Sequence, residues 1–540
     1  MNPPSHMEAR TGHSGFYFDD FEGESAWIRE EACLQLPPLQ GPQNLVIRGL
    51  AKTMPGLGLG ERGFPSLVLG AAGSEARTVR PEAEGPWEIQ LSIGVRAAAE
   101  GAEIRFILEG VGAANSLAWL GRTTGLAPLQ RFRRQGRNRQ LRVQRVETMT
   151  GELVCDFSIR GSTLAPGFMN TAAKPGLNVI GWFDAELGLG ESARCMMRAA
   201  KAADLPAEPI QLLVPCRAAA GNTEFTPSTT GKAPQRTNVF HIDPPASGEI
   251  DRRHGESLRT GKRNIGYWAW ELGEFPDSWV RAFEPFDEIW CPSDFVREAV
   301  AMKSPVPVIT MPHAISVKQP AGDGRTHFKL PKERFLFLFS YDLHSYNSRK
   351  NPQAVLKAFE LAGFGEAEAG LVIKVHNTQG HEAELATLRE QAAKLAGVSL
   401  ITHTLPRYEQ ELLLASCDAF VSLHRAEGFG LAVAEAMALG KAVIATDWSA
   451  TAEYLNAGNG CPVRYSLRRL ERNEGPYPKG AYWAEPDSAH AAQCMRRLVS
   501  EPGLAAALGQ RASETIKERF APAVIGARYQ RRLAAIAQFA

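Results

Sequence analysis

The spacing of apolar residues changes character once along the chain, near Pro175. Before it, short alternating or apolar runs such as Asn44–Ile47, Trp87–Ile93 and Glu103–Leu108 are separated by Gly, Pro and acidic turns. Long amphipathic helical patterns are absent there, which is typical of an all-β sandwich. After Pro175, apolar strand patterns alternate with helical ones, which predicts α/β architecture. We therefore expect an accessory β domain over residues 1–170.

The α/β part begins with a buried-type strand, Leu177–Phe183, and a Gly-rich turn that opens an Ala/Met/Arg helix to about Ala203. Gly188 and Gly190 in this turn match part of the dinucleotide-binding fingerprint. The Gly pair lies well past the strand, however, and no acidic residue ends the following strand. These departures argue against a dinucleotide site.

Two later strands carry polar or aromatic side chains toward their C-terminal ends, near His241 and Glu271. Because open α/β sheets bind ligands beyond the carboxyl ends of their strands, both residues are candidates to line a cleft. For His241, a purely structural role is an equal alternative. Trp268 and Trp270 either form a platform for a sugar ring or pack in the core.

A second α/β unit starts with the apolar strand Arg334–Ser340. After a loop, Arg349 and Lys350 stand at the head of a helix, where cations oppose the helix dipole unless an anion is bound there. The pair therefore favours a phosphate site. Lys374, on the next predicted strand, is a further phosphate candidate.

The segment Ser422–Tyr454 has the pattern of a βαβ unit with an unusual loop. The loop ends in Glu427-Gly-Phe-Gly430 at the start of a helix, so free backbone N–H groups and the positive end of the helix dipole face any ligand there. The helix is otherwise apolar, yet it carries Glu435, and a buried carboxylate is costly without hydrogen-bond partners. A ligand diol would supply two such partners. The alternative is a surface helix with an isolated Glu.

Composition narrows the classes of protein further. The chain of 540 residues has a formal net charge of +1, which argues against general nucleic-acid binding. Its eight Cys show no CxxC pair or Cys/His metal spacing, and no apolar run approaches a membrane span. We expect a cytoplasmic protein. The segment Arg131–Arg145 holds seven Arg and no acid. It leaves open a peripheral contact with membrane phosphates, binding of an acidic glycan or, equally, a solvated strand pair.

The spacing Glu427-x7-Glu435 with Gly-Phe-Gly between resembles the signature of retaining, nucleotide-sugar-dependent glycosyltransferases of the GT-B fold, family 4. The resemblance extends from Leu177 to the C-terminus. It implies two Rossmann-like domains facing a cleft, over residues 171–325 and 326–540, with the last helix crossing back onto the first of them. The region before them looks like the jelly-roll modules that are fused to some glycosyltransferases.

The resemblance also implies roles for individual residues. In that family the first Glu lies at the donor sugar and the second holds the ribose hydroxyls, which assigns these tasks to Glu427 and Glu435. The family grips the donor diphosphate with a Gly-Arg turn and a later Lys. Here Ser340-Tyr-Asp stands in place of the turn, so Arg349 would supply the second charge beside Lys350. Backbone N–H groups would help from four residues, Gly428, Phe429, Gly430 and Leu431.

The implied reaction moves a hexose from a nucleotide-diphosphate sugar to a glycan or lipid-linked saccharide acceptor, with retention of anomeric configuration, in bacterial surface polysaccharide synthesis. Gly188 and Gly190 would form the loop that approaches the donor phosphates and the acceptor. Cations and N–H groups would stabilise the leaving diphosphate, and neither a metal nor a bound cofactor is implied. An inverting enzyme would instead need a general base, with His241 or Glu271 as candidates.

Three alternatives stay open, because fold alone does not decide function. The GT-B fold also hosts sugar epimerases and phosphorylases, and a phosphorylase would need a Lys that holds pyridoxal phosphate. The chain could also be a glycan-binding protein with an inactive transferase fold. The presence of Glu427, Glu435 and Lys350 together favours an active enzyme.

Overall fold

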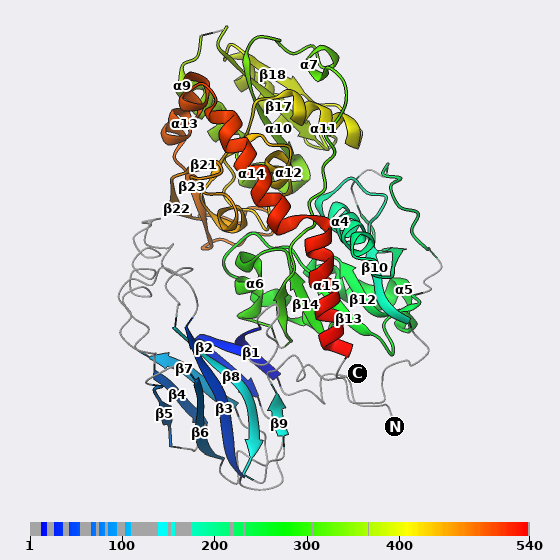
Figure 1. The fold of residues 1–540 in the computed structure, drawn as a ribbon, viewed down its shortest axis with the longest axis vertical. Coiled ribbons are helices and arrows are strands. Elements are labelled where there is room, and N and C mark those ends of the chain that lie inside the picture. The colour runs from blue at the N-terminus through cyan, green and yellow to red at the C-terminus, as the bar shows by residue number, and fades with distance from the viewer. Residues whose placement is uncertain are drawn as a thin grey trace.

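The computed structural model describes residues 12–18, 26–35, 43–53, 66–71, 75–81, 85–93, 103–109, 139–149, 153–156, 174–216, 218, 221–229, 233–304, 306–365 and 367–537. Within these segments an antiparallel N-terminal sheet is followed by two parallel sheets with their helices, and the last two helices run along both parallel-sheet domains (Figure 1). In the same segments, no helix combines the length and apolar character needed to cross a bilayer.

The described N-terminal strands pair antiparallel throughout, in the order β5-β4-β7-β2-β8-β3-β6, with β1 beside β2 and β9 beside β8. In β3, Leu45, Val46 and Ile47 are buried, whereas Arg48 is exposed and pairs with Glu88 across the strand register. The strands are β1 (Gly12–Phe18), β2 (Ala26–Gln35), β3 (Gln43–Thr53), β4 (Ser66–Ala71), β5 (Arg77–Val79), β6 (Gly85–Ile93), β7 (Glu103–Glu109), β8 (Arg139–Thr148) and β9 (Leu153–Asp156). Every element that the structure describes in this region is a β-strand, and the all-β sandwich over residues 1–170 stays a prediction. Most of the basic segment, residues 131–138, lies outside the described residues.

The first parallel sheet has the order β11-β10-β12-β13-β14-β15. Its central strands are buried on both faces, as expected where helices cover both sides of a parallel sheet. Neighbours of the first strand, β10, lie on opposite sides of it, so the sheet has a topological switch point between β10 and β12. Its elements are β10 (Lys174–Gly181), α4 (Gly188–Ala202), β11 (Ala207–Gln211), β12 (Gln235–His241), α5 (Ile250–His254), β13 (Arg263–Tyr267), β14 (Glu288–Cys291), α6 (Asp294–Ala301) and β15 (Val308–Thr310).

The second parallel sheet has the order β18-β17-β16-β19-β20-β21, with its switch point between β16 and β19. A separate two-stranded hairpin, β22–β23, follows it in the chain. The elements are α7 (Gly324–His327), β16 (Phe335–Asp342), α8 (Asn347–Lys350), α9 (Pro352–Ala362), β17 (Ala369–His376), α10 (Glu382–Ala393), β18 (Val398–Ile401), α11 (Arg407–Ser416), β19 (Ala419–Ser422), α12 (Leu431–Ala438), β20 (Ala442–Thr446), β21 (Cys461–Val463), β22 (Tyr465–Arg469), β23 (Tyr482–Pro486) and α13 (Ser488–Ser500).

The βαβ unit predicted over Ser422–Tyr454 is present as β19, α12 and β20. Gly430 precedes α12 with a φ of 86°, a left-handed conformation that residues with a Cβ rarely adopt. A Cβ there would also lie 2.6 Å from Thr451 Cγ2. The glycine therefore allows the chain to turn sharply from the loop into the helix.

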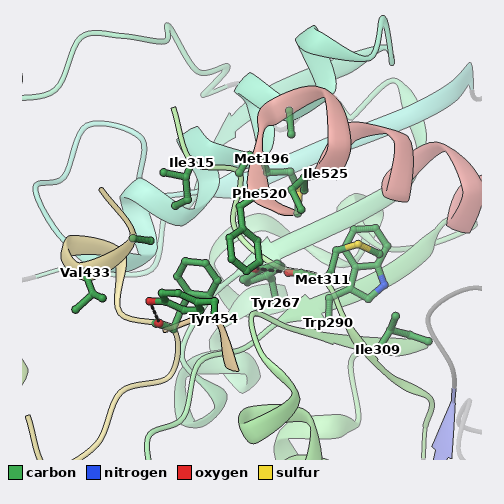
Figure 2. Close-up of a cluster of buried hydrophobic side chains, with 14 of the residues drawn as sticks. Met196, Tyr267, Trp290, Ile309, Met311, Ile315, Val433, Tyr454, Phe520 and Ile525 are labelled. Carbon is green, nitrogen blue, oxygen red and sulfur yellow. Dashed lines mark hydrogen bonds between the residues drawn. The ribbon is translucent and has the colours of Figure 1, made fainter. Parts of the chain in front are cut away.

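The last two helices, α14 (Leu504–Phe520) and α15 (Pro522–Ala537), join the two parallel-sheet domains. The Phe520 backbone carbonyl accepts a hydrogen bond from the Ile315 N–H at 2.8 Å, and its ring packs edge-on against Tyr454. Figure 2 shows Phe520 pointing toward Tyr454, with Met196 and Ile525 around the same core. The helix α15 thus lies on α4 and the first sheet, although it follows the second domain in sequence.

A buried ion pair holds α15 in this position. Arg532 is 1% exposed and donates from Nε to Glu288 Oε1 at 2.8 Å, while Glu288, on β14, is 0% exposed. Arg263 and the Trp290 indole also donate to this carboxylate. Burial alone would raise the pKa of Glu288, but the arginines outweigh it and lower the pKa. The carboxylate is therefore charged and satisfied within the core.

We predict that Arg532→Met lowers the free energy of unfolding by about 3 kcal/mol, because the buried Glu288 carboxylate loses one of its partners. Urea denaturation followed by tryptophan fluorescence measures this loss. Lys517→Ala, which truncates an exposed lysine on α14, should change stability by about 0.5 kcal/mol or less. Equal stability of the two variants would show that the ion pair does not hold α15.

Candidate functional site

A cavity of about 760 Å³ lies between the carboxyl edges of the two parallel sheets. The first domain contributes the Gly188 loop and the segments after β12 and β13. The second contributes the ends of β16 and β19 and the start of α12. Both topological switch points therefore open into one space. This is the place where open α/β sheets bind ligands.

Glu427 lies in this cavity between two cations of the second domain. Its Oε1 is 2.5 Å from Lys350 Nζ, and its Oε2 is 3.2 Å from Arg349 Nη1. All three side chains are largely buried, with exposed fractions of 11%, 20% and 4%. Burial would raise the pKa of Glu427, but Lys350 and Arg349 outweigh it and lower the pKa to about 2. The site therefore holds a charged carboxylate and two cations at neutral pH.

Local turns bring these residues together. Asn351 follows Lys350 with a φ of 58°, which Asn tolerates, and its Nδ2 donates to the Leu423 carbonyl at 3.2 Å. That bond fixes the short helix α8 against the end of β19. The Glu427 N–H donates to Ser449 Oγ at 2.9 Å, which ties the loop to the segment after β20. Lys350, one of the two predicted phosphate-binding residues, is thus adjacent to Glu427 in space, although the two are 77 residues apart in sequence.

The helix α12 presents its start and one carboxylate to the same cavity. Gly428, Phe429, Gly430 and Leu431 all line it, as does Glu435. Glu435 accepts a hydrogen bond from Arg407 Nη1 at 2.7 Å, and Arg407 Nε also donates to Glu411 at 2.9 Å. The only charge on this helix thus faces the cavity, with one oxygen held by a partly exposed arginine.

The Gly-rich turn of the first domain faces α12 across the cavity. Gly188 begins α4 and is open to the cavity, with no atom within 4 Å of where its Cβ would be. Gly190 has a different role: a Cβ there would lie 2.6 Å from the Trp182 carbonyl oxygen. Gly188 therefore leaves room for a ligand, whereas Gly190 lets the helix pack against the preceding turn.

A chain of contacts joins the two domains at one end of the cavity. Tyr477, in the loop between β22 and β23, donates its hydroxyl to Glu271 Oε2 at 2.9 Å. The other oxygen of Glu271 is 3.7 Å from Arg349 Nη2, and Arg349 contacts Glu427. A second-domain loop therefore orients a first-domain carboxylate beside the cationic pair.

Besides Gly190, three predicted site residues do not line this cavity. His241 is fully buried behind Ser192, whose Oγ is 2.7 Å from its Nδ1, so the expectation that it lines the cleft is corrected. Trp268 is 0% exposed and stacks on Phe275, which leaves packing rather than a sugar platform. Lys374 is buried at a smaller adjoining cavity, and burial lowers its pKa to about 8.

Among the cavity residues that were not predicted are Asp243, His313, Arg407 and Tyr477. Asp243 follows β12 directly, so the rule about carboxyl ends of strands would have found it. Burial, and next the charge of Glu271, raise its pKa to about 6. His313 is neutral, because burial lowers its pKa to about 3. Arg407 and Tyr477 carry no local sequence signal, since only tertiary packing brings them to the cavity.

Comparisons with known proteins agree with this architecture. The family model for glycosyl transferases group 1 matches residues 325–515. This match covers most of the second parallel-sheet domain. The sucrose-phosphate synthase of Thermosynechococcus elongatus is similar with a TM-score of 0.51 and 14% identity, covering 68% of this chain and 100% of that one. The fold is GT-B.

Two further solved structures are similar over part of the chain. HepE of Anabaena, solved with UDP-glucose, has a TM-score of 0.47 and 15% identity, covering 67% of this chain and 99% of that one. TarM of S. aureus, solved with UDP, has a TM-score of 0.41 and 14% identity. The match covers 55% of this chain and 55% of TarM, so this chain spans about half of TarM's length. No curated protein matches the chain.

We predict that Glu427→Gln lowers the free energy of unfolding at pH 7 by about 3–5 kcal/mol, because it leaves two buried cations unpaired. The folded pKa of Glu427 lies below its ordinary value of 4.5, so its contribution is complete above pH 4.5 and is lost as the pH falls toward about 2. The stability difference between wild type and variant should therefore shrink over that window.

Urea denaturation at a series of pH values measures the difference. Glu360→Gln, an exposed substitution on α9, is the matched control and should stay close to wild type at every pH. A difference between wild type and Glu427→Gln that does not change with pH would contradict the electrostatic account.

Proposed function

We propose that the protein is a glycosyltransferase that moves a hexosyl group from a nucleotide-diphosphate sugar to a saccharide acceptor with retention of anomeric configuration. The observation that carries the proposal is the placement of Glu427 between Lys350 and Arg349 at the start of α12. This arrangement puts one carboxylate, two cations and free backbone N–H groups in a single cavity formed by both domains.

The donor fits this arrangement in a definite orientation. A diphosphate carries negative charge, so it would lie against Lys350, Arg349 and the N–H groups at the start of α12. Glu435 lies about one helical turn after the start of α12. It would accept hydrogen bonds from the ribose hydroxyls in place of its contact with Arg407. Glu427 would then lie beside the sugar, where its hydroxyls and the developing positive charge are.

The chemistry follows from the charges. As the glycosidic bond to the diphosphate breaks, negative charge grows on the leaving oxygen, and fixed cations and N–H donors stabilise it without reorganisation. The leaving oxygen would take the proton of the attacking hydroxyl on the same face, so no protein base is required. An inverting enzyme would need a base across the sugar ring, and Asp243 or Glu271 would be the candidates, since His241 does not line the cavity.

The wider role is also proposed. We take the acceptor to be a glycan or lipid-linked saccharide in bacterial surface polysaccharide synthesis. The protein would act in the cytoplasm, at the inner face of the membrane. The alternatives are a GT-B epimerase, a phosphorylase and an inactive glycan-binding protein. Binding of a nucleotide sugar followed by transfer to a saccharide separates the proposed function from all three.

We predict that Glu435→Gln weakens binding of the nucleoside diphosphate about tenfold or more, because hydrogen bonds to a charged group contribute about 1.5–3 kcal/mol each. Isothermal titration with UDP, GDP, dTDP and CMP first identifies the nucleotide. Glu411→Gln removes the other carboxylate partner of Arg407 and is the control for effects that act through that arginine. An unchanged dissociation constant in Glu435→Gln would count against ribose binding.

We expect the product to keep the anomeric configuration of the donor and to form in the presence of EDTA. Lys350, Arg349 and the helix start supply the positive character that a metal would otherwise give. NMR of the anomeric proton in a product made in EDTA tests both parts. Inversion would assign a base role to Asp243 or Glu271, and loss of turnover in EDTA would indicate a metal requirement.

A further inference from the structure

A second, smaller cavity lies inside the second domain, beside the large one. Its volume is about 50 Å³, and residues of β16, β17, α11 and α12 line it. The two cavities adjoin, because several residues line both of them. These shared residues are Ser340, His376, Arg407, Gln410, Ala432 and Glu435. The carboxylate proposed to hold the ribose therefore stands where the two cavities meet.

The part of the small cavity that lies away from the large one has mostly apolar walls. The apolar residues that line only the small cavity are Val317, Leu338, Leu413, Leu414 and Phe420. Two charged residues join them, Lys374 and Glu411, and Glu411 already accepts a hydrogen bond from Arg407 Nε at 2.9 Å. Apolar walls with a few placed polar groups are typical of sites for small molecules. A flat ring with one polar substituent would suit these walls.

Lys374 brings an ammonium group to this cavity that is only partly satisfied. The residue is 1% exposed, and Nζ donates to the Val375 carbonyl at 2.7 Å, its only hydrogen bond to the part of the chain that the structure describes. Burial lowers its pKa to about 8, although the Asp342 carboxylate acts in the opposite direction. The group is therefore mostly charged at pH 7. Since an ammonium has three N–H donors and no acceptor, further donors are left for a ligand.

The position of Lys374 separates it from the proposed diphosphate site. Lys374 lines the small cavity only, whereas Lys350 and Arg349 line the large one. A nucleotide carries its diphosphate and its base at opposite ends of the ribose. With the ribose at Glu435 and the diphosphate at Lys350 and Arg349, the base would point away from those cations. The outer edge of the base would then enter the small cavity and meet Lys374.

An ammonium discriminates between bases by the group on that outer edge. Uracil and thymine carry an oxo group at C4, and guanine carries one at C6, so each offers a hydrogen-bond acceptor. Cytosine and adenine carry an amino group at the same positions, and its hydrogens would face a side chain that has only donors. A site built to hydrogen-bond one partner strongly rejects an analogue that cannot form the bond, because its buried polar groups are left unpaired.

We propose that Lys374 determines which base the donor nucleotide carries, by donating a hydrogen bond to an exocyclic oxo group. The donor is then a nucleotide of uracil, thymine or guanine, and not one of cytosine or adenine. This inference rests on the proposed function, because it takes the ribose to lie at Glu435. Lys374 touches the base alone and takes no part in breaking the glycosidic bond.

Two matched pairs of nucleotides test the proposal: UDP against CDP, and GDP against ADP. Within each pair the base that carries the oxo group is compared with its amino counterpart of the same ring size. Isothermal titration of the full-length protein at pH 7 measures the four dissociation constants. In the pair that binds more tightly, the oxo nucleotide should bind roughly tenfold more tightly than the amino one or better, because it gains a hydrogen bond to a charged group.

Two substitutions of Lys374 separate base selection from a structural role. Lys374→Met keeps the length of the side chain without donors, so it should lower the affinity for the oxo nucleotide roughly tenfold and leave the amino one unchanged. Lys374→Gln can donate and accept, so it should bind the amino nucleotide more tightly than wild type does. Lys394→Met, which alters an exposed lysine on α10 that lines neither cavity, is the matched control and should change no affinity.

Three results would overturn the proposal. They are equal affinity of the wild type for both members of the tighter pair, tighter binding of the amino member, and an unchanged preference in Lys374→Met. These results differ from a failure of the proposed function, in which none of the four nucleotides binds. If the oxo and amino nucleotides bind equally well, the nucleotide site stands and only the role of Lys374 is wrong.

Discussion

The return of α15 to the first domain is the constraint on which the rest of the structure depends. The helix leaves the second domain at Phe520, and its Arg532 reaches a fully buried Glu288 on the first sheet. A buried charge without its partner is strongly destabilising, so this position of the helix on the first domain is strongly favoured. With α15 in this position, the last two helices run along both parallel-sheet domains and connect them (Figure 1). The cavity lies between the carboxyl edges of the two sheets.

Within the cavity, one carboxylate organises the charges of the second domain. Glu427 alone would be costly to bury, and Lys350 with Arg349 makes its charged form the stable one. In the proposed reaction the same two cations would also lie against the diphosphate. A ligand then meets groups that are already in position, which reduces the reorganisation that binding requires.

The contacts between the domains also link the two halves of the proposed reaction. Tyr477 belongs to a hairpin of the second domain but orients Glu271 of the first, and Glu271 lies beside Arg349. A movement of one domain against the other would disturb the acceptor side and the donor side together. In the proposed reaction, the geometry of both substrates would therefore depend on this one interface.

The sequence of short segments determined the helices and strands and the loop-helix motif from Glu427 to Glu435. The period of apolar residues, the left-handed turn at Gly430 and the isolated Glu435 are properties of short segments, and β19, α12 and β20 lie where these predict. Tertiary structure alone decided which side chains face the cavity. In a parallel sheet both faces are buried, so an apolar pattern cannot tell the core from the cleft. His241 is therefore enclosed whereas Asp243, two residues later, is open to the cavity, and Tyr477 reaches Glu271 only because the domains are packed together.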